Sequence, residues 1–364
     1  MAERGRLLKV VYLDEAGAPI GETPSQQIPD DPFAGYRGVQ EPPYSLEQLV
    51  FLAETHPTHS SAIEQKAVDV VGTGWRWEAL DEESADESER DELEEWFLGL
   101  AGDGDETMHE LLLAAWLDYE TCAVGYLEVA RDGSGTARQL YHVPAHTVRF
   151  HRDGRRLVQE RSGKRVWFRR WGEPGDETVD AGTGRFGARD GREANELFVV
   201  RRRSRRSSWY GIPTYVSAIG WITLALAARD DNLHFIANRR EPRWAVFLTN
   251  LEEDPNLEDD LRRAFTVDLA RPHRNILVPI TGEGKVTFQK LGEHGDKSDG
   301  SFARLQERAD AAILVAHRVP PERLGAVRVG PLGGNVAFAS SRIYKEGVVS
   351  TSQNLLESRI NRFV

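Results

Sequence analysis

Residues 201–228 read RRRSRRSSWYGIPTYVSAIGWITLALAA, and this stretch decides how the rest of the sequence is interpreted. Arginine fills five of the six positions 201–206, and an almost uncharged apolar run follows. Three structures would place such residues side by side: an arm that binds nucleic acid, a membrane span with basic flanks, or a helix buried between neighbouring subunits. Composition and pattern separate these alternatives.

The overall charge argues against a general duplex-DNA binder. The chain has 364 residues, 40% of them hydrophobic and 29% charged, with a formal net charge of -12. Most of such a surface would repel duplex DNA. This length and composition predict a soluble protein of two or three structural units.

The apolar run also makes a poor membrane span. Ile212–Ala228 is at the lower length limit for a transmembrane helix, carries Pro213 near its start, and continues directly into Arg229 and two aspartates. Met1–Arg6 is charged, so no secretory signal is predicted at the beginning of the chain, and we expect a cytosolic site of synthesis. Cys122, the single cysteine, excludes an intrachain disulfide and cysteine-based zinc frameworks.

Hydrophobic spacing and capping residues predict a mixed α+β chain. After a strand candidate at 7–13 and an extended Pro/Gly stretch, Ser45 caps a predicted helix. Asp153-Gly154 marks a hairpin turn, and a long loop is expected over 172–192. The other elements predicted before residue 200 are helices at 46–53, 59–71, 93–100 and 110–121, strands at 123–130 and 166–171, and a β-rich region over 139–200.

The apolar run predicts a long helix over 214–240, about 40 Å at 1.5 Å per residue. Ile212, Tyr215, Val216, Ile219, Ile222 and Leu226 form one stripe, and Trp221, Leu224, Ala225 and Ala228 lie largely off it. A helix that is apolar over much of its circumference is buried on several sides. Neighbouring copies of the chain would supply those surfaces.

A small α/β unit is predicted beyond this helix. It comprises a strand at 244–249, a helix over 254–265, and a hairpin of 275–280 with 285–291. A second long helix, with Phe302, Leu305, Ala309, Ala312 and Ala316 on one face, ends at Pro320-Pro321. A Gly-rich loop over 325–335 then leads to a last helix that ends near Phe363.

Motifs of enzymes are missing from the sequence. There is no GxxxxGK[ST] loop and no GxSxG elbow, so no cofactor and no catalytic residues are predicted. His56 and His59 are three residues apart, but no further ligands stand nearby, so no metal site is expected. His317, after an apolar run, is interpreted as a structural histidine. The acidic run 81–95 is interpreted as a solvated loop that leads into an amphipathic helix.

Four stretches, 41–74, 210–242, 302–325 and 333–361, resemble the portal proteins of tailed bacteriophages, in the PBSX-type branch. Two short motifs are the most specific. Tyr210-Gly211-Ile212-Pro213 resembles the family's entry into the stem, and His317-Arg318-Val319-Pro320-Pro321 resembles the end of its second stem helix. The four stretches occur in collinear order.

The resemblance implies a ring of about twelve subunits at one capsid vertex, through which duplex DNA is packaged and later ejected. It implies these regions: a wing (1–209), a stem helix (210–240), a clip (241–299), a second stem helix (300–319), a tunnel-loop region (320–338) and a short C-terminal helix of wing or crown (339–364). The implied partners are the large terminase, the capsid or scaffold and head–tail adaptors, with no membrane partner. A virion location follows.

The resemblance also implies roles for individual residues. The DNA-facing tunnel loop would contain Arg328, Gly330, Gly333, Gly334 and Asn335, and channel-lining positions are expected to be acidic or neutral with sparse basic contacts. Since a closed ring requires two different complementary faces on each subunit, subunit contacts are expected at Trp221, Leu224, Leu226, Arg201, Arg202 and Arg203. The arginine cluster 201–206 would pair with acidic surface, for which 81–95 of a neighbour is one candidate.

Two other functions remain open on the sequence. One is a DNA-processing nuclease or maturation protein whose arginine cluster grips its substrate, because a motif search does not detect scattered carboxylates. The other retains the portal fold in a domesticated gene-transfer particle. Since the sequence stops at Val364, a crown is expected to be short or absent.

Overall fold

The computed structural model describes residues 31–72, 74–79, 86–102, 104, 106–173, 177–189, 191–238, 244–249, 285–290, 295–325 and 333–364. The chain divides into two units, one formed by Met1–Thr223 with Ala309–Val364 and the other by Leu224–Arg308. The predicted α+β class is confirmed by a six-stranded mixed sheet accompanied by helices. The predicted strand at 7–13, helix at 254–265 and strand at 275–280 lie outside the described residues.

The first half of the larger unit begins with helices, as predicted. Ser45 caps α1 by accepting a hydrogen bond from the Gln48 N–H, and Thr107 caps α4 in a reciprocal box with Glu110. The acidic run differs from its prediction, because Asp86 caps α3 and residues 87–95 are already helical. These helices are α1 (Leu46–Thr55), α2 (Pro57–Val71), α3 (Glu87–Gly99) and α4 (Met108–Cys122).

The six strands form one sheet in the order β2-β1-β6-β5-β4-β3. All neighbours are antiparallel except β5 and β6, which pair in parallel over a short stretch. Gly154, with φ of 73°, occupies the turn between β3 and β4, which confirms the predicted hairpin. The strands are β1 (Val124–Arg131), β2 (Ala137–Val143), β3 (Val148–Phe150), β4 (Arg156–Arg161), β5 (Lys164–Arg170) and β6 (Glu196–Arg201).

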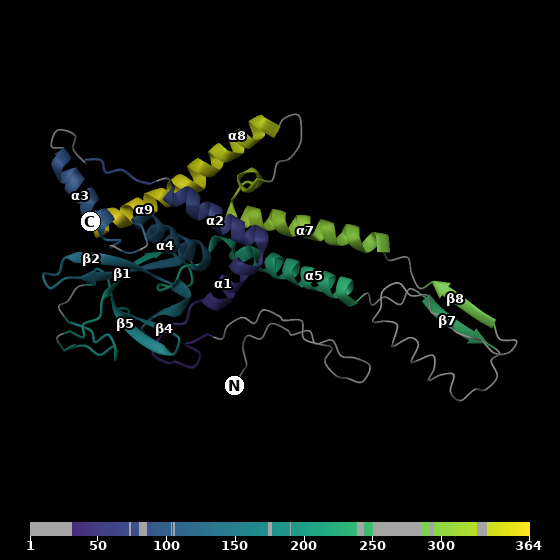
Figure 1. Cartoon of the computed structure of the whole chain (residues 1–364), viewed down its shortest axis with the longest axis horizontal. Helices are drawn as coiled ribbons and strands as arrows, with labels where there is room; N and C mark the ends of the chain where they lie inside the picture. Colours follow the sequence, from purple (N-terminus) through teal and green to yellow (C-terminus); the bar gives the residue numbers. More distant parts are fainter. Residues whose placement is uncertain are drawn as a thin grey trace. The chain divides into compact units, whose positions relative to one another are not determined.

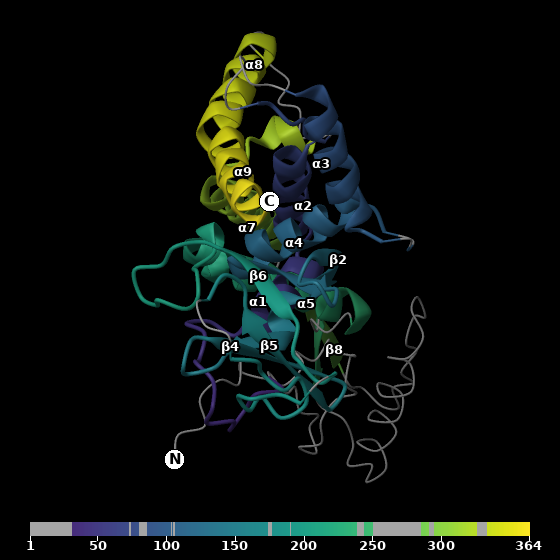
Figure 2. The same ribbon diagram turned by 90° about the vertical axis from the view of Figure 1, so that its left-hand side faces the viewer.

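Helices cover one face of this sheet (Figures 1 and 2). Between α4 and the sheet lies the main core, which includes Trp116, Leu127 and Phe198 and extends to α2 and the C-terminal helices. A smaller cluster, on strands β4 and β5, unites Phe33, Val158 and Trp167. Removal of apolar side chains from water in these two clusters is the main stabilising contribution to the unit.

The long apolar helix has a different start from the predicted one. Residues Thr214–Ala218 form a 3-10 turn (η3), and the α-helix α5 spans Ile219–Asn238, about 30 Å. Ala225, predicted off the apolar stripe, is buried, because it lies three residues after the buried Ile222 and so on the same face of α5.

The remaining elements follow the predicted order. Strand β7 (Trp244–Thr249) pairs antiparallel with β8 (Lys285–Lys290). Helix α7 (Gly295–His317) precedes a 3-10 turn, η4 (Pro321–Leu324). The last helix comprises α8 (Gly333–Tyr344), a π segment over Lys345–Val349 and α9 (Ser350–Phe363), so it ends where the sequence predicted. Among the described residues, no helix has the length and apolarity that crossing a bilayer requires.

Candidate functional site

The two most specific motifs of the family resemblance lie against neighbouring helices, the first at the end of α4 and the second at α2. Tyr210 is buried and its hydroxyl accepts from the Phe150 N–H at 2.9 Å and donates to the Gln40 carbonyl at 3.1 Å. Gly211 is required by close approach, since a Cβ there would lie 2.6 Å from the Ala123 carbonyl oxygen. Pro213 then opens the 3-10 turn η3. The first motif therefore anchors the start of the long helix to the sheet and to the end of α4.

The second motif ends α7. The Arg318 and Val319 N–H groups donate to the carbonyls of Val315 and Leu314, and Arg318 adopts a left-handed φ of 60°. Val319 enters the main core, and Pro320 and Pro321 direct the chain into η4. The helix end is therefore fixed by hydrogen bonds and by burial together.

A buried histidine pair joins the second motif to α2. His59 Nδ1 lies 2.8 Å from His317 Nε2, and both residues are almost completely buried. Tyr215 lies against both rings, with centroid separations of 4.3 Å to His59 and 5.1 Å to His317, and its hydroxyl donates to the Thr121 carbonyl at 2.6 Å. Residues from α2, α4, η3 and α7 thus meet at one point.

The electrostatics of the pair follow from burial. Desolvation, with a smaller contribution from His56, lowers the pKa of His59 to about 3, and desolvation together with His59 lowers the pKa of His317 to about 2. Both rings are therefore neutral near pH 7, and one donates while the other accepts. Burial raises the pKa of Tyr215 well above its usual value, so its hydroxyl remains protonated and can donate.

A buried ion pair lies beside the histidines. The Lys66 ammonium donates to Glu120 Oε2, and both side chains are almost fully buried. Burial lowers the pKa of Lys66, and the adjacent Glu120 opposes that shift. Lys66 Nζ also lies 3.5 Å from the Thr214 hydroxyl at the start of η3. We call the set His59, Lys66, Glu120, Tyr215 and His317 the polar junction.

Arginines of the opening cluster contact the polar junction or its edge. Arg202 Nη2 lies 3.6 Å from Glu120 Oε2, and its guanidinium stacks over Tyr119 at 5.0 Å. Arg201 donates to the carbonyls of Ser208 and Trp209. These two arginines therefore make contacts within their own chain, whereas Arg203 is exposed. Their pairing with an acidic surface of a neighbour stays a prediction.

The predicted subunit-contact residues of α5 differ in exposure. Trp221 is 38% exposed and Leu224 is 44% exposed, while Leu226 is partly buried. Their place between subunits stays a prediction. Of the predicted tunnel-loop residues, Arg328 and Gly330 lie outside the described residues, and Gly333, Gly334 and Asn335 form the first turn of α8 rather than a loop.

Sequence reasoning missed Lys66 and Glu120, although a signal was present. Lys66 falls on the apolar stripe of α2 that also carries Ile63 and Val70, and Glu120 ends the buried face of α4. A charged residue on an otherwise apolar helix face requires a partner of opposite charge. His317 was predicted to be a structural histidine, and its contacts with His59 and Tyr215 confirm this. Among the described residues, no cluster of three or more His, Cys, Asp or Glu side chains could hold a metal ion.

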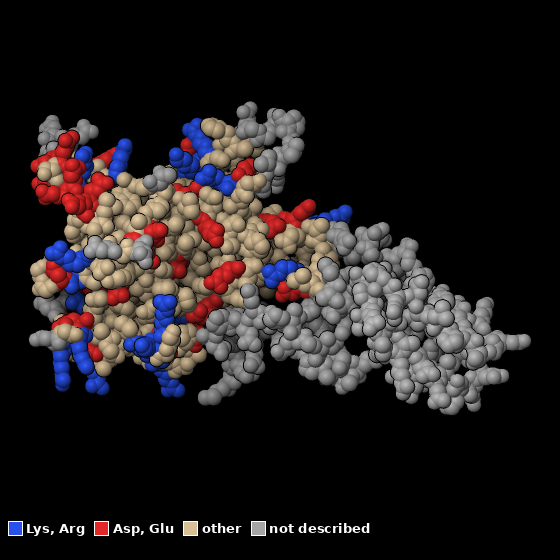
Figure 3. Space-filling model, in the orientation of Figure 1, with Lys and Arg blue, Asp and Glu red and all other residues tan. Residues whose placement is uncertain are grey.

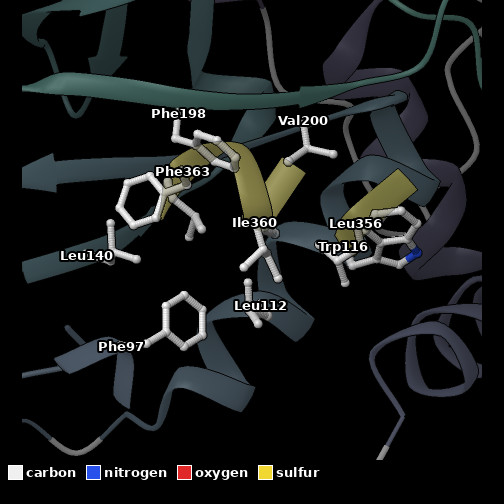
Figure 4. Close-up of a pocket in the computed structure, with 11 residues that line it drawn as sticks. Phe97, Leu112, Trp116, Leu140, Phe198, Val200, Leu356, Ile360 and Phe363 are labelled. Atoms are coloured by element: carbon white, nitrogen blue, oxygen red, sulfur yellow. The ribbon is translucent and has the colours of Figure 1, made fainter. Parts of the chain in front are cut away.

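The same unit also contains an apolar contact between helix α9, the sheet and α4. Leu356, Ile360 and Phe363 of α9 pack over the sheet and α4, around a cavity of about 20 Å³ that is also lined by Phe97, Leu112, Ala115, Trp116, Leu127, Leu140, Phe198 and Val200 (Figure 4). We call this contact the α9 seam. Its lining side chains are apolar apart from the indole N–H of Trp116, and one donor is too few to hold a water molecule.

Comparison with known proteins gives relatives that align with nearly all of this chain. No family model matches the sequence. The chain is 24% identical over 401 residues to the uncharacterized protein YqbA of Bacillus subtilis (strain 168), covering 95% of this chain and 76% of YqbA. It is 22% identical over 405 residues to the phage-like element PBSX protein XkdE of the same organism, covering 96% of this chain and 79% of XkdE.

Solved structures show the fold. A chain in the neck of the native gene transfer agent particle, computed with C12 symmetry, matches with a TM-score of 0.60 and 15% identity, covering 90% of this chain and 82% of that one. The predicted resemblance to the PBSX-type branch of phage proteins is confirmed by the relationship to XkdE.

Proposed function

We propose that this chain, a homologue of the PBSX-type phage proteins, is the subunit of a portal: a ring of about twelve copies at one capsid vertex. The ring would be the channel through which duplex DNA is packaged and ejected, and the docking site for the large terminase and the head–tail adaptors. The chain would act as a structural component of the virion and not as an enzyme.

The observation that carries this proposal is the convergence of the two stem motifs on one anchored site. Thr214 and Tyr215, directly after the first motif, and His317 of the second motif are far apart in sequence, yet all three meet α2 at the polar junction, where Tyr215 also bonds to the end of α4. Two long helices, α5 and α7, thus leave and rejoin the larger unit at neighbouring points. A wing that holds two stem helices is the arrangement that the resemblance implies.

The division of the chain into units is compatible with the proposed regions. The smaller unit, Leu224–Arg308, contains most of α5, the β7–β8 pair and the beginning of α7. In the proposal these are stem and clip, and the six-stranded sheet with its helices belongs to the wing. The tunnel-loop region is proposed to span 320–338.

A ring also accounts for the exposed residues of α5. Trp221 and Leu224 are large apolar side chains with more than a third of their surface exposed. A cyclic assembly buries two different faces of each subunit, and these side chains would lie in such contacts. The fold shared with a chain of the C12 neck supports the same stoichiometry.

The direct test is native mass spectrometry of the purified protein, with negative-stain imaging. The expected result is a ring of about twelve chains with a central hole wide enough for a DNA duplex. A monomer that cleaves plasmid DNA in the presence of a divalent metal ion would overturn the portal proposal in favour of a nuclease.

The neck match favours a second setting for the same function, a gene-transfer particle in place of an infectious phage. Sequencing the DNA from purified particles that contain this chain distinguishes the two. Phage particles would hold the element's own genome, and gene-transfer particles would hold fragments from all over the host chromosome.

A further inference from the structure

Helix α8 presents an unusually apolar outer face. Val336, Phe338 and Ile343 are 58%, 76% and 71% exposed. Val336, Ala339 and Ile343 follow the i, i+3, i+7 spacing of one helix stripe, and Phe338 with Arg342 and Lys345 forms the stripe beside it. Contiguous exposed apolar side chains of this size, edged by charges, are typical of a protein–protein contact.

This face is held in place by the opposite side of the same helix. Tyr344 is only 5% exposed, and its hydroxyl lies 3.0 Å from Asp69 Oδ2 on α2. Arg323 of η4 donates to the same carboxylate, and Gln353 donates to the Val70 carbonyl at 3.2 Å. Because α8 is anchored in this way, its outer residues cannot turn inward without losing these hydrogen bonds.

Helix α3 has an outer face of complementary character. Phe97 is buried and meets the Trp75 ring at 5.5 Å, whereas Leu98 is 47% exposed. Asp91, Glu94 and Glu95 precede Leu98 by seven, four and three residues, so they surround it on one face of the helix. An exposed leucine among carboxylates fits an exposed apolar stripe that is edged by Arg342 and Lys345.

The two helices belong to one unit but lie apart in it. In Figure 2, α8 and α3 stand on opposite sides of α2, and Figure 1 also separates them. Figure 3 shows acidic side chains gathered over α3 and basic side chains beside α8. A heterologous contact in a ring requires two different complementary faces on separate sides of each subunit.

We infer that α8 of one subunit docks on α3 of the next copy of this chain. Phe338 and Ile343 would pack against Leu98, and Arg342 and Lys345 would face Asp91 and Glu95. Arg342 now donates to Glu346 at 2.7 Å, an exposed pair within one helix that can exchange for the stronger acidic surface. This inference rests on the proposed ring and specifies one of its contacts.

Cysteine cross-linking tests the contact directly. The native Cys122 is buried, so a chain with Leu98→Cys and Phe338→Cys carries one reactive thiol on each proposed face. Mild oxidation is expected to give a ladder of covalent oligomers that ends at the ring, on a gel run without reductant. A mixture of the two single variants is expected to give dimers only, and each single variant alone none.

Substitution and charge exchange supply the energetic test. Phe338→Asp with Ile343→Asp is expected to abolish the ring in native mass spectra while the circular dichroism spectrum of the chain is unchanged. Val166→Asp, at an exposed apolar residue of β5, is the matched control and is expected to keep the ring. Arg342→Glu with Lys345→Glu should weaken the ring at least tenfold, and Asp91→Lys with Glu95→Lys on the same chain should restore it.

The outcomes separate the inference from the proposed function. If the wild type forms a ring but the Leu98→Cys, Phe338→Cys variant forms no cross-link, or if the ring survives the two aspartates on α8, the α8–α3 contact is overturned and the portal proposal stays intact. A wild type that forms no ring argues against the proposed function. In that case cross-linked chains in a concentrated sample would still support the contact, and their absence would overturn it.

Discussion

The polar junction and the α9 seam lie in the same unit and hold their helices by opposite means. In the polar junction, directional bonds join α2, α4, η3 and α7, as in the His59–His317 contact of 2.8 Å. In the α9 seam, Leu356, Ile360 and Phe363 pack against an almost entirely apolar surface around a small cavity. Hydrogen bonds fix an angle and a register, whereas apolar packing tolerates adjustment. We therefore predict that substitutions are tolerated less well in the polar junction, where the proposed stem helices meet the wing, than in the α9 seam.

The largest effect is expected from breaking the ion pair of the polar junction. Lys66→Met leaves Glu120 buried without its main partner, and loss of one member of a buried pair costs about 3–5 kcal/mol. Urea unfolding followed by circular dichroism measures this. The double variant Lys66→Met with Glu120→Leu should recover most of the loss, because two apolar side chains replace both charges. A single variant as stable as the wild type would contradict the importance of the pair.

The second largest effect is expected from lowering the pH, because the polar junction contains two histidines whereas the side chains that line the α9 seam do not titrate. The folded-state pKa values of His59 and His317, about 3 and about 2, lie below that of an unfolded histidine, so the unfolded chain binds more protons. Their contribution to stability is therefore present above about pH 6.5 and is lost as pH falls. From pH 7 to pH 5 the expected loss is about 2 kcal/mol for each histidine.

Denaturant unfolding at the two pH values, compared between wild type and His317→Asn, measures the contribution of the histidine pair. The variant is expected to lose less stability on acidification than the wild type. His109→Gln, outside the polar junction, serves as the control and should retain the full dependence. Equal pH dependence in wild type and His317→Asn would show that the pair does not titrate as described.

In the α9 seam a smaller effect is expected. Ile360→Ala removes apolar surface from a partly exposed side chain next to an existing cavity, so the predicted loss is about 1–2 kcal/mol, below that of a fully buried site. Ile360→Leu should be nearly neutral, because the cavity accommodates a change of shape. Thermal unfolding of both variants checks this, and a large penalty for Ile360→Leu would show that the seam is as exacting as the polar junction.

The smallest effect is expected from Tyr215→Phe, which removes one hydrogen bond and keeps the ring packing on both histidines. The lost bond to the Thr121 carbonyl, 2.6 Å in the native chain, is expected to cost about 1 kcal/mol. Tyr215→Leu also removes the ring contacts and should cost more. Equal penalties for the two variants would mean that the hydroxyl makes no net contribution.

Much of the local structure could be predicted from sequence because its causes are local. Ser45 caps α1 as expected, and Asp153-Gly154 forms the expected hairpin turn. The start of α5 was predicted wrongly, because the packing of Tyr215 against His59 and the hydrogen bond of its hydroxyl to Thr121 accompany a 3-10 turn that residue spacing does not reveal. The acidic run was also taken to be a loop where α3 begins at Glu87.

By itself, the sequence determined the α+β class, the order of the elements and the two motifs that mark the ends of the proposed stem. Tertiary structure decided which residues meet: Lys66 with Glu120, 54 residues apart, and His59 with His317, 258 residues apart. It also decided that Arg202 turns toward Glu120 of its own chain. The physical reason is the distance along the chain over which each interaction acts. Backbone sterics, capping and hydrophobic period act over a few residues and can be deduced from neighbours, whereas a buried charge or imidazole finds its partner only when distant helices pack together.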